Sequence, residues 1–306
     1  MASLNELHFH NEEAAYRFVE KRVWPNGTVC PHCGGVENIG KLAGASTRIG
    51  VYKCYQCRKP FTVKVGTVFE ASHIKLYLWL QAMFLMASSK KGISSNQLHR
   101  TLGVTLKTAW FMSHRMREAM RVVGFEPMGG NGASVEVDET YFGDKELVTK
   151  RTKKGKSGHS GKRIVVSLVE RNGGARSFHV SQISKIAMSQ IIAENLHPKS
   201  HLNTDESRLY ADALNFVEQH ESVYHTKGEY VRGETYTNTV EGFFSIFKRG
   251  MKGIYQHCSE KHLQRYLAEF DFRYSNRVAL GVNDMARTDL AIKGIVGKRL
   301  TYRTIN

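Results

Sequence analysis

Two pairs of cysteines constrain the fold of this chain more than any other feature. Cys30 and Cys33 form one Cys-x-x-Cys pair, and Cys54 and Cys57 form a second pair beyond residues 34–53. Each pair is typical of a tight turn that aims two thiolates at one point, and two such turns complete a tetrahedron around zinc. A redox motif is the alternative, but two paired copies without a β-α-β context disfavour it. The pattern therefore predicts a structural Zn²⁺ in a zinc ribbon over residues 21–66.

The charge of the chain indicates what it binds. Its 306 residues include 44 Lys plus Arg against 28 Asp plus Glu, a formal net charge of +16. Such an excess favours nucleic acid, with an anionic membrane surface as the competitor. The longest apolar run, residues 76–87, is too short to span a bilayer, and the polar N-terminus carries no signal-peptide core. We therefore expect a soluble, cytoplasmic protein of two or three domains, with nucleic acid and not a membrane as its partner.

A helical region follows the cysteines. Apolar periodicity predicts helices over residues 73–89, 95–102 and 106–121, with Thr105 as the N-cap of the last. The last two form a helix-turn-helix outline, although a generic three-helix unit has the same pattern. The second of them offers polar side chains to phosphates and base edges. We expect DNA contacts from Lys107, Thr108, His114, Arg115, Arg117 and Arg121.

Beyond a glycine-rich linker at residues 125–133, the pattern becomes that of an α/β domain. Alternation predicts strands over residues 134–140, 163–169, 175–180, 201–204 and 222–225. Helical periodicity predicts helices over residues 186–196, 210–220, 239–250 and 259–274. This order is that of the ribonuclease H-like α/β fold, in which the first and fourth strands are neighbours. A basic loop at residues 150–163 is either a solvated surface loop or a phosphate-contacting one, the latter through Lys153, Lys154 and Lys156.

Three acidic residues far apart in the sequence would meet at one edge of this sheet. Asp138 is expected to end the first strand, Asp205 to end the fourth, and Glu241 to start the helix at 239–250. Singly, each has an ordinary explanation: a turn residue, a helix N-cap, and a surface ion pair with Lys248. Jointly they would repel one another unless hard cations neutralised them, and oxygen ligands favour Mg²⁺ or Mn²⁺. Two such ions about 4 Å apart serve in-line phosphoryl displacement.

Neighbouring acids compete for these roles. Glu136 and Glu139 flank Asp138, and Glu206 follows Asp205. In a strand, Glu139 alternates to the face of Val135 and Val137, which favours Asp138. The choice within each cluster otherwise stays open.

The acidic motif resembles that of a known family. Between Asp205 and Glu241 lie residues 206–240, and Lys248 stands seven residues after the glutamate. This spacing resembles the D, D(35)E arrangement of DDE transposases and retroviral integrases. With the zinc ribbon and the segments VDETYFG, NTDES, TVEGFFSIFKRG and YLAEFDFRY, residues 10–275 resemble bacterial insertion-sequence transposases that join a zinc ribbon to an ISXO-type DDE domain.

The resemblance implies that Asp138, Asp205 and Glu241 hold two Mg²⁺ or Mn²⁺ ions, and that Lys248, with Arg249 beside it, contacts DNA near the scissile phosphate. It implies a nucleoid-associated bacterial transposase, at least dimeric on DNA. Such an enzyme binds the terminal inverted repeats of its element, cleaves by metal-dependent hydrolysis and joins the 3′-hydroxyl ends to target DNA. A structure-specific nuclease is one alternative. A catalytically inactive DNA-binding regulator is another, which the three acids and Lys248 in register disfavour.

The predicted organisation has six parts. An N-terminal helix within residues 1–20 precedes the ribbon at 21–66, the helix-turn-helix region at 70–124 and the linker at 125–133. The ribonuclease H-like domain covers residues 134–285, and residues 286–306 form a tail to which no role is assigned.

Overall fold

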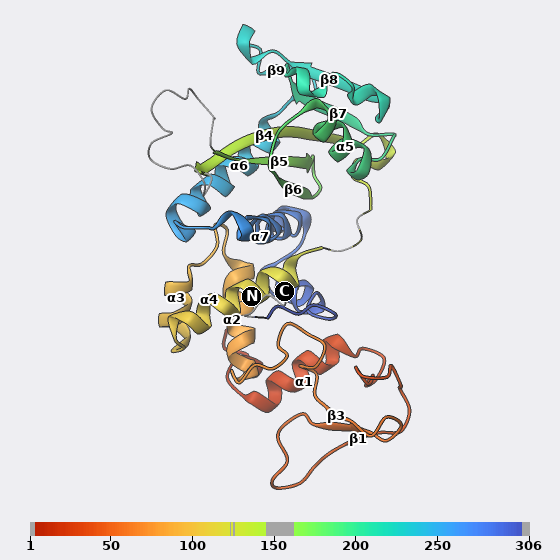
Figure 1. Cartoon of the computed structure of the whole chain (residues 1–306), viewed down its shortest axis with the longest axis vertical. Helices are drawn as coiled ribbons and strands as arrows, with labels where there is room; N and C mark the ends of the chain where they lie inside the picture. Colours follow the sequence, from red (N-terminus) through yellow and green to blue (C-terminus); the bar gives the residue numbers. More distant parts are fainter. Residues whose placement is uncertain (1–3, 123, 125, 145–161, 302–306) are drawn as a thin grey trace. The chain divides into compact units, whose positions relative to one another are not determined.

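The chain divides into two compact units in a computed structural model that describes residues 4–122, 124, 126–144 and 162–301 (Figure 1). The first unit combines residues up to 121 with those from 281 onward, and the second covers residues 122–280. The sequence pattern predicts a different boundary, with the catalytic domain ending at residue 285 and residues 286–306 as a tail. Among the described residues, none of the helices has both the length and the apolar character needed to cross a membrane.

The first unit contains a small sheet and a group of helices. The sheet is antiparallel in the order β1-β2-β3 and consists of β1 (Ile39–Lys41), β2 (Tyr52–Cys54) and β3 (Pro60–Phe61). The helices are α1 (Glu12–Val23), α2 (Leu76–Ser88), α3 (Ser95–Leu102), α4 (Leu106–Met120) and α8 (Asp284–Lys293).

The turn of the predicted helix-turn-helix outline is present, with a capping residue on each side of it. Gly103 ends α3 with φ of 66°, a left-handed conformation that glycine adopts without a Cβ clash. Thr105 then caps α4, because its side chain accepts the backbone N–H of Thr108 at 3.1 Å. Leu98 and Leu102 of α3 and Met112 of α4 are buried, and both helices also contact α2. Buried apolar side chains therefore support the same turn as the caps.

The C-terminal segment belongs to the core of the first unit. Helix α8 packs along α2, and Ala291 and Ile292 are fully buried there. The Arg287 guanidinium donates to the carbonyl of Ala87 at 3.0 Å, and Asp289 pairs with Arg22 of α1 at 2.7 Å. The prediction of a tail at 286–306 was therefore wrong for residues 286–293, which belong to α8.

The second unit is built on a five-stranded mixed sheet. In chain order its strands are β4 (Ser134–Asp144), β5 (Lys162–Glu170), β6 (Ala175–Val180), β7 (His201–Asp205) and β8 (Gln219–Val223). Their order across the sheet is β6-β5-β4-β7-β8, with β4, β5 and β6 antiparallel and β7 and β8 parallel to β4. The first and fourth strands are neighbours, as expected of the ribonuclease H-like fold.

Helices cover both faces of this sheet. Helix α5 (Lys185–Asn195) shares a buried cluster with Val135 and Val137 on one face. Helices α6 (Asn238–Gly250) and α7 (Leu263–Ser275) share a second cluster with Val165 and Val169. A stripe of apolar side chains on α6 is buried: Val240, Phe243, Phe244 and Phe247. Phe247 makes edge-to-face contacts with Phe142 and Phe270 at ring-centroid distances of 5.6 and 5.3 Å.

Two predictions about this unit were wrong. Strand β4 continues to Asp144, so Asp138 lies in its middle and not at its end. The helix expected at 210–220 is replaced by two short 3₁₀ turns, Arg208–Tyr210 and Ala213–Asn215. The helical periodicity there came from Tyr210, Ala213 and Val217, which are buried against the sheet without a regular helix. A small hairpin of β9 (Val231–Arg232) and β10 (Thr235–Tyr236) leads into α6.

Candidate active site

The four cysteines of the first unit converge on one point. The Sγ atoms of Cys30 and Cys57 are 3.7 Å apart, those of Cys33 and Cys54 are also 3.7 Å apart, and all four lie within 4.8 Å of one another. Zinc–sulfur bonds of about 2.3 Å in a tetrahedron place the sulfurs about 3.8 Å apart. The cluster therefore fits a structural Zn²⁺. It sits on the small sheet, where Cys54 ends β2 and only a few apolar side chains such as Phe61 are buried with it.

The second unit brings the three predicted acids to one region. Asp138 is on β4, Asp205 is the last residue of the neighbouring β7, and Glu241 is in the first turn of α6. The β4–β7 ladder pairs Glu136 with Asn203, and Asp138 and Asp205 each follow two residues later on their strands. Because alternate residues share a face, both carboxylates lie on the side of the sheet that α6 covers.

These acids influence one another electrostatically. Burial, together with the carboxylates of Glu139, Asp205 and Glu241, raises the pKa of Asp138 to about 8. Burial also raises the pKa of Asp205, which accepts the backbone N–H of Ser207 at 3.0 Å. Carboxylates held this way are stabilised by a cation, and their oxygen donors suit Mg²⁺ or Mn²⁺. Within the described ranges, however, only the cysteines bring three or more potential ligand atoms within 4.8 Å, so a shared ion requires the acids to draw closer.

Two of the competing acids are occupied elsewhere. Glu139 faces the other side of the sheet, where it accepts the hydroxyl of Tyr210 at 2.7 Å. Glu206 accepts the backbone N–H groups of His225 and Thr226 at 2.9 and 3.1 Å, and the pKa of its carboxyl is lowered to about 2 by backbone hydrogen bonds. These contacts favour Asp138 over Glu139 and Asp205 over Glu206.

Comparison with known proteins agrees with this architecture. The family profile of the ISXO2-like transposase domain matches residues 129–275, and that of the transposase zinc-ribbon domain matches residues 10–60. The chain therefore combines a transposase zinc-ribbon domain with an ISXO2-like transposase domain. It is also 27% identical over 280 residues to an uncharacterised protein in transposable element ISH50 of Halobacterium salinarum, an alignment that covers 87% of this chain and 91% of the relative.

The two basic residues of α6 that are expected to contact DNA lie on the exposed side of this helix. Lys248 and Arg249 are both exposed in its last turn, seven and eight residues after Glu241. Within the described part of the chain Lys248 has no ion-pair partner, so the surface pair with Glu241 is not formed. The predicted contacts from Lys153, Lys154 and Lys156 fall outside the described residues.

The candidate DNA contacts of the first unit divide into exposed and buried groups. Lys107 and Arg121 are exposed and Thr108 is half-buried. Arg115 and Arg117 are 6% and 1% exposed, and His114 is 1% exposed. The Arg115 guanidinium donates to the carbonyls of Val68, Glu70 and Leu300 at 2.9 to 3.2 Å.

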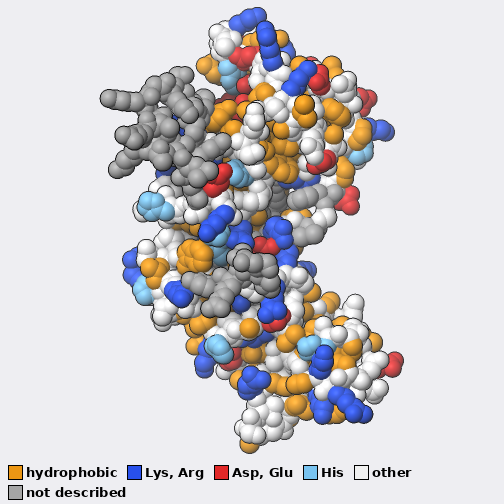
Figure 2. Space-filling view, in the orientation of Figure 1, with side chains coloured by type: hydrophobic (Ala, Val, Ile, Leu, Met, Phe, Trp, Pro, Cys, Tyr) orange, Lys and Arg blue, Asp and Glu red, His pale blue; other side chains and the backbone are white. Residues whose placement is uncertain are grey.

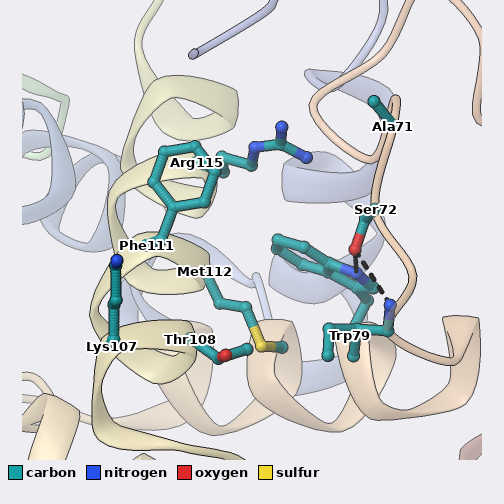
Figure 3. Close-up of a pocket in the computed structure, with 9 residues that line it drawn as sticks. Ala71, Ser72, Trp79, Lys107, Thr108, Phe111, Met112 and Arg115 are labelled. Atoms are coloured by element: carbon teal, nitrogen blue, oxygen red, sulfur yellow. Dashed lines mark hydrogen bonds between the residues drawn. The ribbon is translucent and has the colours of Figure 1, made fainter. Parts of the chain in front are cut away.

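This burial corrects the DNA-contact prediction. The guanidinium of Arg115, which binds three backbone carbonyls inside the unit, stabilises the fold. The buried guanidinium of Arg117 is likewise engaged inside the unit, where it donates to the Ser113 hydroxyl. The charge of Arg115 alone does not reveal that carbonyls from distant parts of the chain bind its guanidinium. Figure 3 shows Arg115, Phe111 and Lys107 of α4 at one side of a pocket of about 220 Å³, opposite Trp79 of α2, whose indole N–H donates to Ser72.

Sequence reasoning missed two side chains beside the acids. The Thr237 hydroxyl donates to the Glu241 carboxylate at 3.2 Å, and His225 Nε2 lies 3.5 Å from the same hydroxyl. His225 also lowers the pKa of Asp205, an effect smaller than that of burial. A signal existed, because β8 runs parallel to β7 and the residues after its end, such as His225, must reach the same sheet edge as Asp205.

Proposed function

We propose that this chain is a DNA transposase in which Asp138, Asp205 and Glu241 form the metal-binding triad. The matches to the two transposase domain families support a DNA-processing enzyme. The observation that carries the proposal is geometric: neighbouring strands β4 and β7 and the first turn of α6 bring Asp138, Asp205 and Glu241 to one region, although they are far apart in the sequence. Perturbed acids gathered in this way are typical of functional sites.

The three carboxylates would hold Mg²⁺ or Mn²⁺, as two ions in the arrangement of the family. When bound, the ions neutralise the acids and activate the attacking oxygen of an in-line displacement at phosphorus. The protein's own contribution is position. Strands β4 and β7 supply two carboxylates from one sheet, and the buried phenylalanine stripe of α6 fixes the third.

Recognition of DNA is proposed for both units. The net charge of +16 favours a polyanion, and Lys and Arg side chains are widespread on the face drawn in Figure 2. In the first unit we keep Lys107, Thr108 and Arg121 as contacts to the terminal repeats. In the second, Lys248 and Arg249 would hold backbone near the cleaved bond. Action on two element ends implies at least a dimer on DNA.

The test is cleavage and joining of defined DNA. A labelled duplex that carries the inverted repeat flanking the coding region is incubated with the zinc-bound protein, Mg²⁺ and a target plasmid. Nicks with 3′-hydroxyls at the repeat end, followed by their covalent joining to the plasmid, are expected. Cleavage without joining would identify a nuclease instead, and binding without cleavage would identify an inactive regulator.

A further inference from the structure

Glu136 ties β4 to the start of α6. Its side chain is completely buried, and its carboxylate accepts four hydrogen bonds. The backbone N–H and the hydroxyl of Thr239 each donate at 2.7 Å, the backbone N–H of Val240 donates at 3.0 Å, and Arg171 Nε donates at 2.7 Å. An ionised carboxylate offers about four acceptor positions. Glu136 therefore has no free position for a metal ion, although it is only two residues from Asp138.

The carboxylate also replaces the ordinary cap of the helix. Helix α6 starts after Thr237, whose side chain makes no capping hydrogen bond. The next free N–H groups, those of Thr239 and Val240, are the ones that an N-cap side chain normally satisfies. Glu136 satisfies both from a neighbouring strand, and its negative charge is favourable at the positive end of the helix dipole. The start of α6 is thus fixed to the sheet itself.

Arg171 extends the connection to the segment that enters the helix. Besides Glu136, its guanidinium donates to the carbonyls of Glu234 and Tyr236 at 2.6 and 2.9 Å. It also lies over the Tyr236 ring at 3.5 Å. The pair of Glu136 and Arg171 therefore determines both where the chain arrives from β10 and where α6 begins.

Two of the proposed metal ligands flank this connection. Asp138 follows Glu136 by two residues on the same face of β4, and Glu241 directly follows Val240, whose N–H Glu136 accepts. We propose that Glu136 is a positioning residue that sets the Glu241 carboxylate against Asp138 and Asp205, and that it is not itself a metal ligand. This inference rests on the proposed function of the triad.

The test replaces Glu136 with glutamine. The amide of E136Q turns one acceptor oxygen into a donor that faces N–H groups, so the start of α6 must shift while side-chain size is kept. Loss of a residue that orients metal ligands typically costs about 10–100-fold in metal affinity. We expect a rise of at least about tenfold in the Mn²⁺ dissociation constant, measured without DNA by paramagnetic resonance of free Mn²⁺. The Mg²⁺ concentration for half-maximal cleavage should rise in parallel, while the affinity of the zinc-bound protein for terminal DNA without Mg²⁺ or Mn²⁺ stays unchanged.

A matched control separates positioning from general stability. Asp271 of α7 is half-buried and accepts the backbone N–H and the hydroxyl of Ser177 at 2.8 and 2.6 Å, a hydrogen-bond pattern like that of Glu136 with Thr239. D271N should lower the urea midpoint of the second unit and leave both metal readouts at wild-type values. D138N in the same assays reports on the triad itself: if D138N still binds Mn²⁺ and cleaves normally, the proposed function fails whatever E136Q does.

A gentler variant covers the case in which E136Q does not fold. T239V removes only the hydroxyl donor to Glu136 and keeps the backbone donors and the shape of the side chain. We expect its Mn²⁺ dissociation constant to rise by a few-fold. If E136Q, or T239V in its place, folds and binds Mn²⁺ with wild-type affinity while D138N does not, Glu136 has no positioning role.

Discussion

Replacing Asp138 with asparagine should abolish a pH-dependent loss of stability in the second unit. Burial, with help from the neighbouring carboxylates, raises the pKa of Asp138 from 3.8 to about 8. Since the folded-state pKa lies above the unfolded value, the folded protein binds the extra proton between these limits. The stability contributed by protonated Asp138 is therefore complete at low pH and is lost as pH rises toward 8.

The size of the effect follows from proton linkage. One proton bound in excess by the folded state changes the free energy of unfolding by about 1.4 kcal/mol per pH unit. Between pH 5 and pH 7, without added Mg²⁺ or Mn²⁺, wild-type protein should lose about 3 kcal/mol relative to D138N. Glu139 and Asp205 have raised pKa values too, but they are present in both proteins, so their contributions largely cancel in the difference.

The assay must report on the second unit alone. Met188 and Met251 are 0% and 1% exposed there, so protection of these side chains from oxidation in a urea series measures its unfolding. The 3 tryptophans, Trp24, Trp79 and Trp110, all lie in the first unit, and their fluorescence provides an internal control. If the stability difference between D138N and wild type changes by less than about 0.5 kcal/mol from pH 5 to 7, the assigned environment of Asp138 is wrong.

Three further predictions concern the metal and DNA contacts. Removal of Zn²⁺ should unfold residues 21–66, because metal binding supplies on the order of 10 kcal/mol to such ribbons; unchanged circular dichroism and protease resistance in chelator would exclude this. R115A should lower the stability of the first unit by about 3 kcal/mol, judged by fluorescence in urea, since it breaks hydrogen bonds to three carbonyls. The salt dependence of DNA affinity should stay the same in R115A. A shallower slope of this dependence would mean that Arg115 does contact a DNA phosphate. K248A, by contrast, should reduce that slope by about one phosphate contact, and an unchanged slope would count against its role.

Sequence was sufficient where chemistry or periodicity depends on few residues. Four cysteines in two pairs leave one metal geometry, and their sulfurs converge as that geometry requires. Glycine and threonine at residues 103 and 105 define the ends of α3 and α4 through their own backbone and side-chain chemistry. The order of strands and helices was enough to place Asp138 and Asp205 on neighbouring strands.

Sequence was insufficient where distant segments decide the outcome. Nothing near Arg115 indicates that the carbonyl of Leu300 will reach it, so a buried structural arginine resembled a DNA contact. The role of residues 284–293 depends on packing against α2, some two hundred residues earlier in the chain. Sequence likewise cannot distinguish the role of Glu136 from that of Asp138, because the N–H groups of α6 that donate to Glu136 are about a hundred residues away in the chain.

The most direct test of the account is the cleavage rate of E241A. Single-turnover cleavage of labelled terminal DNA is measured in saturating Mg²⁺, together with the affinity of the zinc-bound protein for the same DNA without Mg²⁺ or Mn²⁺. Loss of one ligand of a catalytic metal site should remove several kcal/mol of transition-state stabilisation, so cleavage should fall by at least about a hundredfold while DNA affinity stays at the wild-type value. Wild-type cleavage by E241A would contradict the triad of Asp138, Asp205 and Glu241.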